Sequence, residues 1–232
     1  ATSAIGENSH AEGDETIAFM DAAHAEGLQT YAYGQGSHSE GYNTSAVGAF
    51  SHSMGIQTQA QGDYSCAGGL SSITYGIYDL SFGKGCTTSG IASTSFGVSA
   101  IVNGDASFVI GSSTTVSGIA SFAGGTSSSA LSNNAFAYGA NNLSNGNYSV
   151  TLGRGNVATN NNSVALGYYN ISSGIAAVSI GYMTSAITDY SYSEGYRTYS
   201  KGGHSEGTST SALSVNSHPE GQLPQAIGGH AH

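Results

Sequence analysis

A glycine recurs every 14 residues along nearly the whole chain. The spacing runs without a slip from Gly13 to Gly195, and Gly207 and Gly221 follow at spacings of 12 and 14. A short fixed period is typical of a small unit that stacks on copies of itself, and it argues against a globular enzyme core. We therefore predict a single repeat domain over residues 1–232, made of about sixteen coils.

The composition excludes two classes of partner. Only four residues are Lys or Arg and the net charge is -10, so we expect no nucleic-acid partner, since phosphates require basic side chains. No apolar run approaches the ~20 residues that span a bilayer, so we expect no membrane insertion of this segment. The chain begins and ends within a repeat, with Ala231 and His232 in phase with Ser217 and His218. We expect it to be a fragment of a longer fibrous protein.

Each 14-residue unit contains two halves that are typical of short strands. The first half follows Ser-x-Ala-x-Gly, as in residues 163–167, and the second follows Thr-x-Ala-x-Gly, as in residues 30–34. A period of 2 indicates a strand whose alternate side chains point to one side. Two strands packed this closely leave room for small side chains only, so we predict an interior of Ser, Ala and Thr. We expect the glycines to supply permissive backbone at the turns.

The alignment of the repeats also predicts two features of side-chain bonding. The Thr/Ser column that includes Thr16, Thr44 and Ser72 faces inward in this scheme, and we expect its hydroxyls to hydrogen-bond along the stack. The two cysteines, Cys66 and Cys86, fall in different columns, so we expect no disulfide between them.

The outward positions differ between the two strands. On the second strand they are mixed, as at Gln59 and Gln61, which indicates a solvated face. On the first strand they form two columns, three residues and one residue before each period glycine, that are apolar in the middle of the chain. Since the interior is already filled, this stripe must be buried against another surface, most economically the same face of identical chains. The predicted interface residues are His10, Glu12, His24, Glu26, His38, Glu40, Phe82, Phe96, Phe108, Ile110, Phe122, Phe136, Val150, Leu152, Val164, Leu166, Val178, Ile180, Glu194 and Glu206.

Three coils carry a motif that resembles a known family. Residues 162–167 read NSVALG, and residues 148–153 (YSVTLG) and 177–181 (AVSIG) are close variants. This motif is similar to the repeat of the YadA-type head of trimeric autotransporter adhesins. The resemblance implies an all-β, left-handed parallel β-roll of 14-residue coils with two short strands each. It also implies a homotrimer with the two bulky residues of the motif at the trimer interface.

Both ends of the chain replace the apolar motif by SHAEG or SHSEG, which also resembles repeats of phage tail fibres. Histidine and glutamate two residues apart on a strand point the same way, about 6.5–7 Å apart. We favour an interchain layer in which each Glu accepts a hydrogen bond from a His of the next chain. A second interpretation is Zn²⁺, Ni²⁺ or Fe²⁺ held on the trimer axis by three chains, with Glu behind the ligands. The candidate axial ligands are His10, His24, His38, His204 and His218.

A third interpretation of these columns is a pH-sensitive interface. Histidine titrates near about pH 6.5, and protonated rings would relieve repulsion among the stacked carboxylates of Glu12, Glu26 and Glu40. We expect no resident cofactor under any of the three interpretations.

The sequence predicts no enzyme. A catalytic triad requires unlike roles at one unique place, whereas the Ser-His-Glu triplet recurs in most terminal coils. The asparagines Asn134, Asn142 and Asn170 suit turns, and the last two begin formal N-glycosylation sequons.

These observations predict a non-enzymatic, trimeric fibrous surface protein. We expect an adhesin head or shaft that mediates attachment, on a bacterial cell surface or a virion fibre, with a host-surface protein or glycan as receptor. Tyr31, Tyr33, Tyr42 and Tyr75 are candidate aromatic contacts. One alternative is a structural segment of a phage tail fibre or extracellular filament, with binding carried elsewhere. Another is an ice-binding solenoid, which the inward Thr column disfavours.

Overall fold

The computed structural model describes residues 1–228, and the chain divides after Val116 into two compact units. We call Ala1–Val116 unit 1 and the remainder unit 2. Throughout the described residues the secondary structure consists of strands and turns without a helix, so no helix there is long and apolar enough to cross a membrane. The predicted all-β parallel solenoid of 14-residue coils is confirmed. The left hand of the coil and the single domain over residues 1–232 stay predictions, and Ala231 and His232 lie outside the described residues.

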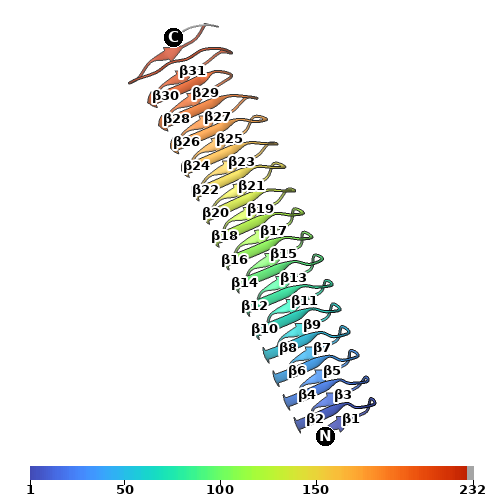
Figure 1. Cartoon of the computed structure of the whole chain (residues 1–232). Helices are drawn as coiled ribbons and strands as arrows, with labels where there is room; N and C mark the ends of the chain where they lie inside the picture. The colour runs from blue at the N-terminus through green and yellow to red at the C-terminus, as the bar shows by residue number, and fades with distance from the viewer. Residues whose placement is uncertain (229–232) are drawn as a thin grey trace. The chain divides into compact units, whose positions relative to one another are not determined.

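Each coil of unit 1 contributes one long and one short strand, and strands of a kind pair in parallel with their equivalents 14 residues on, as in His24↔His38 (Figure 1, blue to green). The long strands are β2(His10–Asp14), β4(His24–Leu28), β6(His38–Tyr42), β8(His52–Ile56), β10(Cys66–Leu70), β12(Leu80–Lys84), β14(Thr94–Val98) and β16(Phe108–Ser112). The short strands are β1(Ser3–Ala4), β3(Ile17–Ala18), β5(Tyr31–Ala32), β7(Ser45–Ala46), β9(Gln59–Ala60), β11(Ile73–Thr74), β13(Thr87–Thr88), β15(Ile101–Val102) and β17(Thr115–Val116).

Unit 2 repeats this coil, with one shortened turn. Its long strands are β18(Phe122–Thr126), β20(Phe136–Ala140), β22(Val150–Arg154), β24(Val164–Tyr168), β26(Val178–Tyr182), β28(Tyr192–Tyr196) and β30(His204–Thr208). Its short strands are β19(Ser129–Ala130), β21(Leu143–Ser144), β23(Val157–Ala158), β25(Ile171–Ser172), β27(Ser185–Ala186), β29(Tyr199–Ser200), β31(Ser211–Ala212) and β32(Gln225–Ala226). The spacing of 12 residues between Gly195 and Gly207 shortens the turn before β30 to residues 201–203. The register of the long strands is kept, because Tyr192 pairs with His204.

The interior of the coils is built from small side chains, as predicted. Ala18, Ala25 and Thr16 are fully buried. The expected hydroxyl ladder along the stack is only partly present. Ser72 donates to the Gly83 carbonyl of the next coil at 3.1 Å. Thr44 instead bonds within its own coil, to the Ser39 hydroxyl at 2.8 Å. Because the Thr44 hydroxyl already has a hydrogen-bond partner within its own coil, it does not need one in the next coil.

Asparagine side chains make the hydrogen bonds between successive coils that we had expected from Thr and Ser hydroxyls. Asn142, Asn156 and Asn170 occupy the Thr column in consecutive coils and are buried. The Asn156 side-chain amide donates to the Gly167 carbonyl of the next coil at 2.8 Å, and its backbone N–H donates to Asn142 Oδ1 at 2.9 Å. Asn142 and Asn170 lie in the two-residue connections that follow β20 and β24, and both side chains are buried inside the coil. Asn134 also lies in a turn, with a φ of 57°.

Both cysteines are free, in line with their different columns. Cys86 is buried in the Thr column, with its Sγ 3.2 Å from the Gly97 carbonyl. Cys66 is half-buried on the outward side of β10, and burial raises the pKa of its thiol.

The period glycine lies inside the long strand, so the expectation that it sits in a turn was wrong. Gly97 has a φ of +134° in β14, and a Cβ there would stand 1.8 Å from the carbonyl oxygen of Gly111 in the next coil. The turns instead place ordinary residues at φ near +55°, such as Ala22 and Gln29. Among the described residues, none with positive φ is β-branched, which agrees with the crowding such side chains meet there. Close approach of neighbouring coils therefore sets the 14-residue period.

One carboxylate interrupts the small interior residues of unit 1. Asp79 is buried in a column that holds Ser65 and Ser93 in adjacent coils. Its carboxylate accepts the backbone N–H of Ser93 at 3.0 Å and of Gly76 at 2.9 Å. Burial raises the pKa of this carboxyl, and the two hydrogen bonds lower it by less than burial raises it. The ionised carboxylate is therefore a destabilising element of the folded chain.

We expect Asp79→Ser to raise the free energy of unfolding at pH 7. Because the pKa of Asp79 is raised in the folded state, ionisation of this carboxyl lowers the free energy of unfolding. The loss is complete above the folded-state pKa and fades as the pH falls through it. The advantage of the serine variant should therefore shrink between pH 7 and pH 4 in urea unfolding. Asp63→Ser is the matched control, because Asp63 is exposed and also accepts a backbone N–H, from Ala49 at 2.8 Å. An advantage that does not depend on pH would contradict this account of Asp79.

Candidate functional site

The outward side chains of the long strands form one surface in each unit, which we call the long-strand face. It comprises the residues three and one before each period glycine, and the intervening residue points into the coil, as Ser95 does on β14. In unit 1 its apolar part holds Phe82, Phe96, Phe108 and Ile110. The Phe82 and Phe96 rings stack with centroids 6.1 Å apart.

The apolar part of the long-strand face continues in the coils of unit 2. It holds Phe122, Phe136, Val150, Leu152, Val164, Leu166, Val178 and Ile180. Leu152 is 45% exposed and Phe136 38% exposed. Their strands already bury the inward residues between the two sheets of the coil, so nothing within a unit covers this face. The structure thus places the predicted apolar residues outside the coil, and their contact with other chains stays a prediction.

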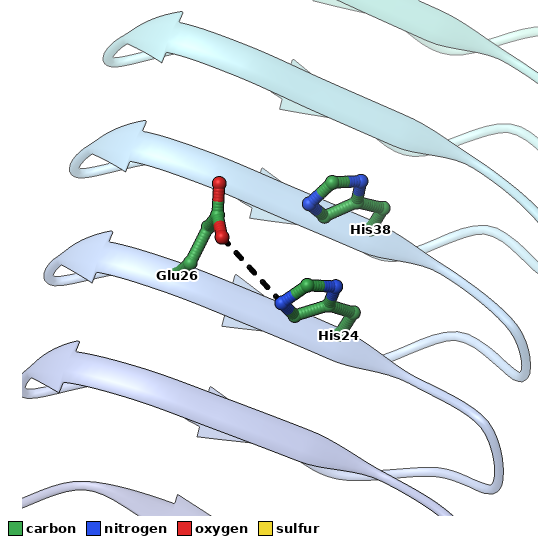
Figure 2. Close-up of side chains that lie close together, drawn as sticks. All are labelled: His24, Glu26 and His38. Atoms are coloured by element: carbon green, nitrogen blue, oxygen red, sulfur yellow. Dashed lines mark ion pairs between the residues drawn. The ribbon is translucent and has the colours of Figure 1, made fainter.

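Histidine and glutamate occupy the long-strand face at the start of unit 1. Figure 2 shows His24 and Glu26 on β4 beside His38 on β6. The His24 Nε2 atom lies 3.6 Å from Glu26 Oε2, and His52 Nε2 lies 3.3 Å from Glu40 Oε1 of the preceding coil. The His24 and His38 rings stack with centroids 4.6 Å apart and planes 7° apart. His10 and Glu12 form the same pair at 3.5 Å, where both side chains are largely exposed.

The last coils of unit 2 repeat the arrangement. His204 Nε2 lies 3.9 Å from Glu194 Oε1, and His218 Nε2 lies 3.8 Å from Glu206 Oε2. The rings of His204 and His218 stack at 4.5 Å. The Tyr192 hydroxyl donates to Glu194 Oε2 at 2.8 Å, and burial together with this carboxylate raises the pKa of that hydroxyl. Glu194 and Glu206 thus each have a histidine of an adjacent coil nearby.

Five glutamates of the long-strand face have a histidine nearby within the same chain: Glu12, Glu26, Glu40, Glu194 and Glu206. The sequence predicted that Glu accepts from a His of the next chain, but the in-chain atoms lie 3.3–3.9 Å apart. Two causes bring them together: side chains two apart on a strand lean toward each other, and parallel strands place neighbouring coils about 4.8 Å apart. An interchain bond is therefore not required to pair these charges.

Three of the four predicted tyrosines lie on or directly after short strands, and the fourth ends a long strand. Tyr31 and Tyr33 stack with centroids 5.8 Å apart, and Tyr33 is 40% exposed. Tyr42 lies on β6 beyond the period glycine, and Tyr75 follows β11; both are exposed. The structure does not bring Tyr42 and Tyr75 together with the first pair.

Two sets of stacked aromatic side chains, one in turns and one at the ends of long strands, were missed by the sequence reasoning. Phe50, Tyr64 and Tyr78 stack at 5.5 and 5.1 Å in unit 1, and each is more than half exposed. In unit 2, Tyr168, Tyr182 and Tyr196 stack at 4.9 and 5.0 Å. Both sets are spaced by 14 residues, so the column alignment contained the signal.

A comparison with family models identifies the repeat. The model described as the YadA head domain repeat matches in two copies, over residues 1–19, 25–51 and 144–170. These three segments of the chain carry YadA head repeats. The matches include the His–Glu coils of residues 1–19 and 25–51 as well as the NSVALG coil, so these N-terminal coils belong to the same repeat. No curated protein matches the chain.

The YadA head match supports a surface-exposed protein of the trimeric autotransporter adhesin type that associates with itself. The YadA head family is a family of non-enzymatic adhesins, in line with the absence of a unique catalytic constellation from the sequence. The resemblance inferred from the residues is thereby confirmed.

Proposed function

We propose that this YadA-head chain forms a homotrimeric head or shaft that mediates attachment, and that the long-strand face is its trimer interface. The observation that carries the proposal is the uncovered apolar stripe. Ile110 and Leu152 remain 44% and 45% exposed, although every coil interior is filled by small residues. A continuous apolar patch on a soluble chain marks a surface that is covered in the assembly. Identical chains supply a matching stripe of the same length.

The His–Glu coils fit the same interface because histidine side chains lie beside the glutamates. A carboxylate that loses water without a partner is strongly disfavoured. Glu26 and Glu40 each have a histidine nitrogen within 3.6 Å in their own chain, so the face can close over them. The interchain hydrogen-bonded layer remains our proposal for how neighbouring chains meet there.

The receptor surface, in this proposal, lies on the short strands and the turns, which the trimer leaves free. Exposed aromatic rings supply large contact area at low entropic cost, and Tyr is enriched at interfaces. The stack of Phe50, Tyr64 and Tyr78 offers three adjacent rings to a host-surface protein or glycan.

Binding of the trimer to host cells and to an array of glycans tests the attachment role. We expect wild-type binding, and at least about a tenfold loss in Tyr64→Ser/Tyr78→Ser, since truncated aromatic anchors commonly cost 2 kcal/mol or more. Tyr190→Ser is the control, because Tyr190 is 80% exposed and lies outside this stack. A wild-type trimer that binds no cell and no glycan would overturn the attachment role and favour a purely structural segment of a fibre or filament.

The ice-binding alternative loses its surface in this structure. Thr16, Thr30 and Thr44 are fully buried, so the Thr column is not presented to water.

A further inference from the structure

Two histidines and one glutamate of a single chain converge on the long-strand face of unit 1. Nε2 of His24, Nε2 of His38 and a carboxylate oxygen of Glu26 come from adjacent strands (Figure 2), and the potential ligand atoms of these residues all lie within 4.8 Å of one another. Zn²⁺ binds imidazole nitrogen and carboxylate oxygen at about 2.0–2.2 Å, so two ligands of one tetrahedral ion stand about 3.3–3.6 Å apart. Since Nε2 is at the far end of the side chain, rotation of the rings can bring the ligand atoms from their present separation of up to 4.8 Å to the shorter distance that the metal requires.

The two imidazole nitrogens have unused bonding capacity. His24 Nε2 and His38 Nε2 are shielded from solvent and make no hydrogen bond. Glu26 Oε2, at 3.6 Å from His24 Nε2, lies beyond hydrogen-bond distance. Leaving a shielded polar atom without a partner is unfavourable. The parallel stacking of the rings presents both nitrogens on the same side, where one ion satisfies both.

The charge around these residues favours a cation. Glu12, Glu26 and Glu40 line one open groove of about 470 Å³ with the period glycines. Parallel strands hold these carboxylates at roughly the 4.8 Å spacing of adjacent coils, where like charges repel. No Lys or Arg precedes Lys84 in the sequence. A divalent ion would offset this repulsion at neutral pH without requiring protonated histidine.

We propose that His24, Glu26 and His38 bind a divalent transition metal such as Zn²⁺ as direct ligands from one chain. His204, Glu206 and His218 form the equivalent cluster in unit 2. This differs from the axial site expected from the sequence, in which three chains each give one histidine and glutamate stands behind. Because one chain supplies all three ligands, the inference does not rest on the proposed trimer. The fourth tetrahedral position is left for water or another ligand.

The neighbouring cluster of His38, Glu40 and His52 shares its central histidine with the first. One imidazole offers a single lone pair to a metal, so only one of these two overlapping clusters can be complete at a time. The expected capacity is therefore two ions per chain, one in each unit.

Zinc titration of the whole chain tests the proposal. The protein is made without a histidine tag and with His230→Gln and His232→Gln, so that only histidines of the described residues bind. Competition with a chromophoric chelator gives stoichiometry and affinity, and Co²⁺ absorption reports tetrahedral ligation. We expect two ions per chain, and one per chain in His38→Gln. The vacated site should weaken more than about 100-fold, because even outer partners of metal ligands are worth 10–100-fold.

His10→Gln is the matched control, since His10 occupies the same column but is outside the three clusters. It should retain two ions. Should His38→Gln fail to fold by circular dichroism, Glu26→Gln/Glu40→Gln removes both carboxylates while keeping the ring stack and should likewise leave one ion. No zinc binding at micromolar concentration, two ions in His38→Gln, or one ion per three chains at each site would overturn the proposal. The mass of the protein in solution, measured in parallel, shows separately whether the proposed trimer forms.

Discussion

Gly97→Ala is expected to lower the free energy of unfolding by about 3–5 kcal/mol. Two costs add. A Cβ at this residue stands 1.8 Å from the Gly111 carbonyl oxygen, which is main chain of the next coil and cannot rotate away. The φ of +134° is also one that L-residues rarely adopt. Relieving either cost pulls β14 away from β16 and breaks their ladder.

Gly85→Ala is the control for this prediction. Gly85 has a positive φ of +62°, but the nearest atom to its Cβ would be Ser99 Oγ, at 4.0 Å. Ser99 itself occupies the equivalent turn position of the next coil with a φ of 52°. We therefore expect a cost of only about 1 kcal/mol in urea unfolding. Equal losses in the two variants would show that positive φ, and not contact between coils, explains the 14-residue period.

Leu152→Glu is expected to convert the trimer into monomers. Leu152 lies in the middle of the apolar stripe, on β22 between Tyr138 and Leu166 of the adjacent coils. In a trimer built on the long-strand face, the substitution places three carboxylates against apolar neighbours without a basic partner. Burying an unpaired charge is strongly disfavoured, so the dissociation constant should rise by at least about 100-fold. The mass in solution should fall accordingly, while the coil itself stays folded.

Ile171→Glu is the matched control. Ile171 is 42% exposed, close to the 45% of Leu152, but it lies on the short strand β25. The same change of an exposed apolar residue to glutamate should leave the trimer intact there. Loss of the trimer in both variants, or in neither, would contradict the assignment of the interface to the long-strand face.

The coil and the identity of its faces were predictable from the sequence. A repeat of 14 residues with an inner period of 2 is compatible with few folds other than a β-solenoid. The size of the side chains in each column showed whether that column points into the coil, as Ala25 does, or outward, as Phe96 does. Outward apolar columns stood out because small residues occupied every alternate position. The resemblance of residues 162–167 to the YadA head repeat then supplied the family.

The features that sequence reasoning missed depend on distances between coils. A glycine at a strand position and a glycine at a turn look alike in a column, and it is the place of Gly97 inside β14, with a φ of +134°, that identifies it as a strand glycine. Asn156 looks like a turn residue until its column is seen to be buried, where its amide bridges adjacent coils. The in-chain approach of His24 and Glu26 depends on the lean of two side chains, which spacing alone does not fix.

The mass of the intact chain in solution, measured by light scattering, tests the central claim most directly. One chain weighs 23.3 kDa. The proposed assembly through the long-strand face predicts three times this value, about 70 kDa, over a range of protein concentrations. A mass of 23.3 kDa at every concentration would mean that the apolar stripe stays exposed to water, and it would contradict the proposed trimer.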